Sequence, residues 1–278
     1  MDVLSILLLG VAGIFGGILA GLIGIGGGII YIFLLEIFIK QYNIPADLYS
    51  AFIVANSIVG VFFATLSSSL SLIRYKQFYS RLVLLVSLGS IPTALLILYF
   101  FVNTSSFSPT LFNTLLMVVL FFMIYKTAEK LLKDRKAAKD QVPAKNKANE
   151  SVPWLMSGGA AGGGIAALTG LGGGVVMVPI LHSILNMDMK KARSVSLGVI
   201  VLTSLIMSIL NATKKVQLEV HHIGLIIPAV TLPIVIGVTI GGPIGIRISQ
   251  NMPSRTVSII YIIFLGLFTI KKGIEWLN

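Results

Sequence analysis

Two glycine-rich segments are the part of this sequence whose residue types and spacing are best suited to chemistry. The segment AGLIGIGGG at residues 20–28 recurs 146 residues later as AALTGLGGG at residues 166–174, and six of the nine positions are identical. Each copy lies inside a charge-free apolar run, where a row of glycines costs helix stability and leaves backbone N–H groups without partners. The pattern predicts a break in a membrane-embedded helix, present twice in the chain.

The predicted chemistry of these breaks is the binding of a small anion. The helix that follows each break begins with unpaired N–H groups, and helix N-termini attract negative charge. Non-helical backbone at membrane depth survives only where protein buries it or where it lines a watered cavity. We therefore expect the two helix starts to face one shared substrate site, formed by Gly24, Gly26, Gly27, Gly28, Gly170, Gly172, Gly173 and Gly174. The alternative is that the glycines only allow helices to cross closely.

Hydroxyl side chains near the breaks could complete an anion site with neutral hydrogen-bond donors. Thr169 lies within the second glycine segment itself, and the offset of 146 aligns Ser50 with Ser196 and Ser57 with Thr203. The candidate hydroxyls for substrate binding are Ser50, Ser57, Thr169, Ser194, Ser196 and Thr203. Each of them could instead bond across neighbouring helices, as hydroxyls in membrane spans often do.

Two ionisable side chains fall inside apolar segments, where such residues are rare and often functional. Glu36 and His182 occupy matched positions at the offset of 146, in the short helix after each break. Either could carry a proton in a coupled transporter. Glu36 also precedes Lys40 by four residues, so an interfacial ion pair explains it equally well. His182 could likewise be a hydrogen-bonded histidine at a helix interface.

The sequence offers no convincing catalytic, cofactor or metal site, so we expect no enzyme. A nucleotide-binding glycine loop must follow a strand and lead into a soluble helix, and no Lys-Ser or Lys-Thr pair follows these glycines. Intramembrane enzymes need acids, histidines or an activated nucleophile within the spans, and only Glu36 and His182 approach that. The chain contains no cysteine, which excludes disulfides and thiolate metal ligands.

The composition of the chain predicts that these residues lie on membrane helices. Hydrophobic residues make up 56% of the 278 and charged residues 11%, which is typical of a polytopic membrane protein. About 20 apolar residues span a bilayer. The apolar runs predict a broken helix pair at 3–39 with spans at 48–72, 82–102 and 110–132, and again a broken pair at 152–186 with spans at 194–211, 223–248 and 256–277. We therefore expect an all-α membrane protein of two homologous halves, each a glycine-broken helix pair plus three spans.

The predicted halves are residues 1–132 and 152–278, joined by a basic linker at 133–151. Duplication of this kind is typical of transporters whose site lies at the repeat interface. If each broken pair is a re-entrant hairpin, the halves are inverted, and 16 Lys and Arg lie inside against 5 outside. If each pair crosses once, the halves are parallel, and the count is 15 against 6. The positive-inside rule does not separate these arrangements, and we expect the inverted one because the short second helices then need not cross alone.

The net charge of +11 is carried by turns and by the linker rather than by a folded basic face. We therefore expect a multi-pass protein of the cell membrane with a cytoplasmic linker and no nucleic-acid partner. Arg74 and Arg193 could draw anions toward an inner mouth, although topology alone accounts for basic residues in turns. The lipid bilayer and a small anion are the expected partners.

The glycine segments, together with the turn at 192–197, resemble the sulfite exporter TauE/SafE family of membrane permeases. The most specific part is GLGGG at 170–174, with Pro179 five residues later and ARSVSL at 192–197. The chain departs from the family pattern where a Gly-Thr-Ser element is usual, since it has RSVS at 193–196 and LYS at 48–50. The resemblance implies ATP-independent transport of small sulfur-containing anions such as sulfite or organosulfonates, as in permeases of the toluenesulfonate uptake type.

The function expected from these patterns is secondary transport of small anions by alternating access around the paired breaks. Two alternatives stay open from the sequence. One is a channel-like ion pathway in which carbonyl groups face the cavity. The other is a membrane scaffold or assembly subunit whose glycines only pack helices.

Overall fold

The computed structural model is helical over the residues it describes, which are 2–42, 44–97, 99, 117, 121, 124–129, 131–132, 150–169, 173–216, 218 and 221–277. In chain order the helices are α1 (Val3–Ile23), α2 (Gly28–Ile39), a 3₁₀ turn (Lys40–Tyr42), α3 (Ala46–Arg74), α4 (Ser80–Ile97), α6 (Val152–Thr169), α7 (Gly174–Pro179), a π-helix (Ile180–Ile184), α8 (Met189–Ala212), α9 (Pro228–Gln250) and α10 (Ser254–Leu277). Within the described residues, five helices are long and apolar enough to cross a membrane: Val3–Ile23, Leu48–Arg74, Ser80–Ile97, Met189–Ala212 and Pro228–Gln250. The expected all-α polytopic membrane protein is confirmed. Most of the predicted span at 110–132 and of the linker at 133–151 lies outside the described residues.

The first glycine segment ends α1 and begins α2. Helix α1 stops at Gly24, whose φ of 91° lies in the left-handed region that favours glycine. Gly26 and Gly27 have φ values of 79° and 75°, and α2 starts immediately after them. With 12 residues, α2 is about 18 Å long, well short of the roughly 30 Å hydrocarbon core. The chain breaks where the glycines predicted, and α2 cannot cross a bilayer alone.

The helix after the second break is less regular than the first. Helix α7 follows Gly173, whose φ is 72°, and it ends at Pro179. Because proline has no N–H, the Val175 carbonyl loses its intrahelical donor and accepts the Tyr261 hydroxyl instead. The chain then continues as a π-helix. The sequence predicted a single short helix here and missed the π-helical turn.

Helices α1 and α3 both run parallel to α9. The contacts that show this are Gly10 with Pro233 and Gly21 with Gly242 for α1, and Asn56 with Thr231 and Ser67 with Val238 for α3. The chain is therefore on the same side of the bundle at the start of α1 and at the start of α3. The pair α1 and α2 enters the bundle and returns to its own side, as a re-entrant hairpin does.

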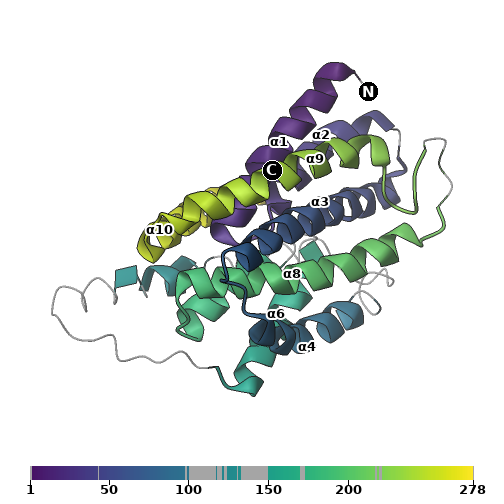
Figure 1. Ribbon diagram of the computed structural model, residues 1–278. Coiled ribbons are helices and arrows are strands. Elements are labelled where there is room, and N and C mark those ends of the chain that lie inside the picture. The colour runs from purple at the N-terminus through teal and green to yellow at the C-terminus, as the bar shows by residue number, and fades with distance from the viewer. Residues whose placement is uncertain are drawn as a thin grey trace, which may run out of the picture.

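In the second half, the helix before the break and the long helix after it also run in the same direction. Helices α6 and α8 both run parallel to α4, through Met156 with Gly89, Gly163 with Ser90, Gly198 with Val83 and Met207 with Ala94. Figure 1 shows α3 and α8 side by side. They are antiparallel, because Ile58 shares a cluster with Met207, whereas Leu72 shares one with Leu197. Helices in corresponding positions of the two halves thus run in opposite directions.

Each helix that leads into a break packs on a helix of the other half. Helix α1 lies along α9, and α6 lies along α4. A Cβ added at Gly13 would lie 2.6 Å from the Ile234 carbonyl oxygen, and one at Gly159 would collide with the Val86 carbonyl. Small residues allow such backbone contact between membrane helices. Glycines in α1 and α6 therefore pack helices, in addition to the glycines that form the breaks.

Helix α9 begins five residues later than the predicted span. Residues 223 and 226 form an isolated bridge, and the helix starts at Pro228, a favoured first position for proline. Asn56 of α3 fixes this turn, since its side-chain oxygen accepts from the Ile227 N–H at 2.8 Å and its amide donates to the Leu225 carbonyl at 3.0 Å. The turn is therefore anchored to the bundle.

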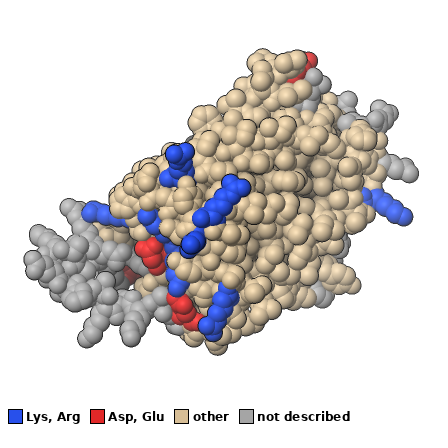
Figure 2. All heavy atoms as spheres, viewed as in Figure 1, with Lys and Arg blue, Asp and Glu red and all other residues tan. Residues whose placement is uncertain are grey.

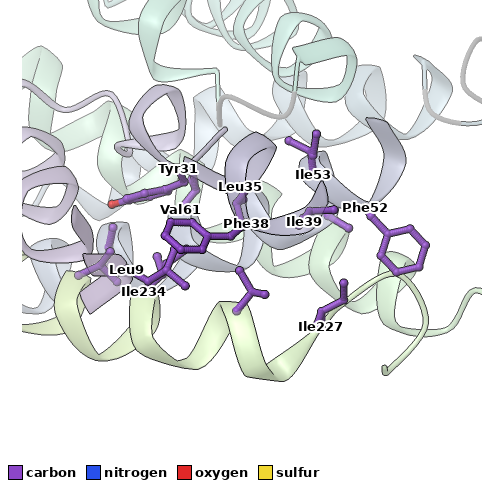
Figure 3. Close-up of a cluster of buried hydrophobic side chains, with 14 of the residues drawn as sticks. Leu9, Tyr31, Leu35, Phe38, Ile39, Phe52, Ile53, Val61, Ile227 and Ile234 are labelled. Carbon is purple, nitrogen blue, oxygen red and sulfur yellow. The ribbon is translucent and has the colours of Figure 1, made fainter. Parts of the chain in front are cut away.

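The largest apolar cluster holds α2 against two full spans. Figure 3 shows Tyr31, Leu35 and Phe38 of α2 near Val61 of α3 and Ile234 of α9. All five side chains are buried. The short arm of the hairpin is therefore enclosed by protein, which is the condition for irregular backbone within a membrane.

Charged side chains gather at one end of the bundle, at the lower left of Figure 2. That end carries the starts of α4, α8 and α10 and the end of α9, with Arg81, Lys190, Lys191, Arg247 and Arg255. There Lys191 forms an ion pair with Glu150, and Lys190 donates to the Gln250 carbonyl at 3.1 Å. The opposite end, where α2 and α8 finish, carries Lys40, Lys214 and Lys215. The described basic residues are thus unequally divided between the two ends.

Candidate functional site

The two glycine breaks lie against each other inside the bundle. A Cβ added at Gly174 would lie 2.6 Å from both the Gly24 carbonyl oxygen and the Ile25 Cα, so only glycine fits this contact. Residues 21–28 and 173–182 are all buried. The described parts of the two breaks therefore face protein rather than lipid, and they approach each other as the repeated motif predicted.

Two of the predicted hydroxyls donate to carbonyl groups of the first break. The Ser196 hydroxyl of α8 lies 2.9 Å from the Gly24 oxygen, and the Ser57 hydroxyl of α3 lies 3.2 Å from the Gly28 oxygen. Both serines are buried. The break is thus held at one end by the second half of the chain and at the other end by the first half.

The start of α2 presents backbone donors without backbone acceptors. Ile30 and Tyr31 donate to the Gly27 carbonyl, at 3.0 and 3.5 Å. Among the described residues, the amides of Gly28 and Ile29 donate to no backbone carbonyl, as is usual for the first turn of a helix. These amides give the helix start a partial positive charge.

Arg193 places a full positive charge beside the first break. Its side chain is completely buried, and a Cβ added at Gly24 would lie 2.6 Å from the Arg193 Cγ. The Nη1 atom donates to the Leu22 carbonyl at 3.3 Å. Within the described part of the chain, Nε and Nη2 have no hydrogen-bond partner, and no carboxylate forms an ion pair with this guanidinium. Asp188 acts on this guanidinium electrostatically without forming an ion pair with it, so two of its nitrogens remain uncommitted among the described residues.

The sequence placed Arg193 in a turn because the predicted span began at residue 194. The helix α8 actually begins at Met189, since the Asp188 carboxylate caps it by accepting from the Lys190 N–H at 2.9 Å. The extra turn carries Arg193 into the bundle. The cap was the signal that could have found it, because aspartate directly precedes the run MKKAR.

Tyr31 is a second buried polar group at the first break, and sequence reasoning did not identify it. Its hydroxyl lies beside Gly27 and has no hydrogen-bond partner among the described residues. In the sequence it looked like an ordinary aromatic residue of an apolar stretch.

Three predicted hydroxyls lie away from the contact between the breaks. Ser50 is exposed near the start of α3. Ser194 donates to the Gln77 carbonyl at 2.7 Å, in the turn before α4. Thr203 donates to carbonyls of its own helix, at 3.1 and 3.2 Å. Ser194 thus bonds to a turn and Thr203 to its own helix in this structure.

The alignment of Ser50 with Ser196 fails because the offset of 146 does not continue into α3. Gly60 of α3 packs on Ile234 of α9, and Gly198 of α8 packs on Val83 of α4. Gly60 and Gly198 therefore occupy corresponding positions in the two halves, and they are 138 residues apart in the sequence rather than 146. Helix α3 begins with extra turns before this point, and Ser50 lies on them.

Glu36 and His182 lie at opposite ends of the bundle. The Glu36 carbonyl accepts from the Tyr49 hydroxyl near the start of α3, at 2.6 Å, and the side chain is half-buried. His182 lies on the π-helix, with Nδ1 2.8 Å from the Met187 carbonyl and Nε2 3.4 Å from the Ser258 hydroxyl. The described residues include no ion pair between Glu36 and Lys40.

Part of the second break lies outside the described residues. Gly170 and Gly172 belong to that part, and Thr169 is described only as the last residue of α6, without its side chain. Gly173 is described, and a Cβ there would collide with the Gly162 carbonyl, as one at Gly27 would lie 2.6 Å from the Gly16 carbonyl. The described backbone at the two breaks therefore has matching close contacts.

Comparison with known proteins assigns the chain to a family of transporters. A probable membrane transporter protein of Bacillus subtilis, YunE, is 26% identical to it over 98% of this chain and 99% of the relative. A protein named as a probable membrane transporter in Methanocaldococcus jannaschii is also 26% identical, over 94% of this chain and 92% of the relative. No solved structure matches the chain. The family model described as sulfite exporter TauE/SafE matches residues 9–271, and the protein belongs to this family of membrane transporters.

Proposed function

We propose that this protein is a secondary transporter of small anions, with sulfur oxyanions such as sulfite or organosulfonates as its substrate class. The observation that carries the proposal is Arg193, a buried guanidinium with two unpartnered nitrogens beside the contact of the two breaks. The name of the family supports sulfur-containing substrates. The protein itself acts as a membrane transporter and not as an enzyme.

An unpaired buried charge is costly, and a bound anion removes that cost. Burial of one ion without a partner costs several kcal/mol even after relaxation. A guanidinium presents its N–H groups in a planar fork that fits two oxygens of one oxyanion. A single cation is balanced by a monoanion, so hydrogen sulfite or a sulfonate matches Arg193 better than a dianion such as sulfate does.

The carbonyl groups of the first break argue against a cation pathway. Such a pathway needs carbonyl oxygens that are free to replace the hydration shell of the ion. The Gly24 and Gly28 oxygens instead accept the hydroxyls of Ser196 and Ser57. The Gly24 and Gly28 oxygens are therefore not free to coordinate a cation, and the Arg193 guanidinium beside Gly24 favours an anion.

The proposed mechanism is alternating access between two inverted halves, residues 1–132 and 152–278. The opposite directions of corresponding helices and the exchange of packing between the halves support it. The basic end of the bundle, with the linker at 133–151, is proposed to face the cytoplasm of a cell-membrane protein. In this arrangement Gly24, Gly26, Gly27 and Gly28 of one break and Gly170, Gly172, Gly173 and Gly174 of the other enclose the substrate.

Coupling to protons is proposed to involve Glu36 rather than His182. Both ring nitrogens of His182 lie near oxygen atoms of Met187 and Ser258, so this ring already holds the π-helix against the turn before α8 and against α10. No hydrogen bond of the Glu36 carboxylate is formed with the described residues. A free carboxylate can exchange a proton without breaking a structural contact.

The proposal is tested by flux in proteoliposomes. Labelled sulfite, methanesulfonate and sulfate are offered to vesicles with and without a pH gradient, and protein-free vesicles are the control. We expect uptake of the monoanions, weaker uptake of sulfate, and loss of the pH-gradient effect in Glu36→Gln. Absence of flux for all three anions, in protein shown to be folded, would sink the proposal and favour the scaffold alternative.

A further inference from the structure

We infer that the hydroxyl of Tyr31 is a ligand of the transported oxyanion, to which it donates a hydrogen bond at the start of α2. The inference rests on the proposed function and names a neutral donor in the same site. It assigns Tyr31 a role in binding, whereas the ring of this residue also belongs to the apolar cluster around α2.

The side chain of Tyr31 turns back toward the break. Helical side chains lean toward the N-terminus of their helix, so a residue one turn into α2 reaches its first turn. A Cβ at Gly16 would collide with the ring, and one at Gly27 would collide with the hydroxyl. In Figure 3 the phenol oxygen points away from Leu35 and Phe38. The hydroxyl therefore lies beside the glycines at the start of α2.

This hydroxyl is buried without a partner. Tyr31 is 0% exposed, and its oxygen has no hydrogen bond with the described residues. Buried tyrosine hydroxyls normally find a partner. Tyr261 shows the usual situation, since it is equally buried and donates to the Val175 carbonyl. The Tyr31 hydroxyl differs from it in having no partner beside Gly27, next to the Gly28 amide, which donates to no backbone carbonyl among the described residues.

The corresponding position in the second half shows that packing does not require this hydroxyl. The offset of 146 places Met177 there, and Met177 packs against Gly162 as Tyr31 packs against Gly16. An apolar side chain thus fills the same space next to the same kind of glycine. The oxygen is extra to the packing, and its position among donors suits an acceptor such as an oxyanion oxygen.

The experiment compares Tyr31→Phe with Tyr261→Phe by thermal unfolding of the purified full-length protein in increasing methanesulfonate, with gluconate at equal ionic strength as the control. A hydrogen bond to a charged group is consistent with an effect of about tenfold in affinity. We expect Tyr31→Phe to unfold at the same or a higher temperature without anion, and to need about tenfold more methanesulfonate for the same shift. Tyr261→Phe should unfold earlier but respond to the same methanesulfonate concentrations as the unaltered protein.

The outcomes separate this inference from the function on which it rests. An unchanged methanesulfonate response in Tyr31→Phe overturns the inference and leaves anion transport standing. A lower unfolding temperature of Tyr31→Phe without anion would show that the hydroxyl has a structural partner, which also overturns it. No methanesulfonate response in the unaltered protein overturns the sulfonate part of the proposed function, and this inference with it.

Discussion

Arg193 is a buried cation whose one hydrogen bond within the described residues goes to the Leu22 carbonyl. A main-chain oxygen offsets only part of the cost of removing a charge from water. Under the proposed function, the charge weakens the empty protein and strengthens the anion-loaded one. This is the energetic pattern expected of a ligand-binding residue rather than of a structural one.

Replacing Arg193 by glutamine is expected to abolish anion binding without loss of stability. Charged hydrogen bonds contribute enough for the affinity for methanesulfonate to fall at least about tenfold. The empty variant should unfold at the same or a higher temperature, because an unpaired buried charge has been removed. Uptake in proteoliposomes and thermal unfolding measure the two effects.

Arg247→Gln is the matched control, since Arg247 lies exposed near the end of α9 at the same end of the bundle. Its uptake should stay near that of the unaltered protein. If Arg193→Gln transports as well as Arg247→Gln does, Arg193 is not the anion ligand.

At the scale of elements, the α1–α2 hairpin depends on glycines in the left-handed region. Gly27 illustrates this most clearly, because its φ is 75° and a Cβ there would meet the Tyr31 hydroxyl and the Gly16 carbonyl. A side chain at this position is both strained and obstructed. The break is therefore built into the backbone and is not a consequence of side-chain packing.

Gly27→Ala is expected to destabilise the protein by at least about 1–2 kcal/mol, the cost of the left-handed conformation for an L-residue. The collision with α1 adds to this cost. Gly266→Ala is the matched control in α10, since nothing lies within 4 Å of a Cβ there. Alanine in place of that helical glycine should be neutral or stabilising by roughly 0.5–1 kcal/mol. Thermal unfolding measures the stability of both variants. Equal stabilities would contradict the need for glycine in the left-handed backbone at position 27.

The sequence predicted the breaks well because a cluster of glycines has few other uses in an apolar helix. Gly24, Gly26 and Gly27 all have positive φ. It predicted the register of α3 poorly, because α3 begins with extra turns that α8 lacks, and these carry Ser50 out of line with Ser196. It placed Arg193 in a basic turn near an inner mouth rather than beside the break, and it did not single out Tyr31, because the unmet hydrogen bonds of both side chains arise only from packing.

At the scale of the whole molecule, the two halves exchange packing partners and run in opposite directions. In the proposed mechanism, one site between them is approached from either side by equivalent movements. The ends of the bundle also differ in charge, with Arg81, Lys190 and Arg255 at one end and Lys40 and Lys214 at the other. The arrangement of the two halves thus bears both on the orientation of the protein in the membrane and on the proposed alternating access.

Cysteine labelling is expected to place the two ends on opposite faces of the membrane. The chain has no cysteine, so single substitutions report without background. Lys40→Cys and Lys214→Cys should react with an impermeant reagent from outside, because the positive-inside rule puts the more basic end in the cytoplasm. Arg81→Cys should react only after permeabilisation. Labelling of Lys40→Cys and Lys214→Cys from different faces would refute the inverted arrangement.

The packing of α1 on α9 also has a consequence for biosynthesis. Gly13 meets Ile234, so the partner surface of α1 is synthesised about 220 residues after α1 itself. At 5–20 residues per second, this delay is roughly 10–40 s. During that time the glycine face of α1 lies in the bilayer without its partner helix, and the first half alone cannot complete its fold. Assembly of this protein is therefore a late, whole-chain event, in which the last helices to leave the ribosome enclose the first.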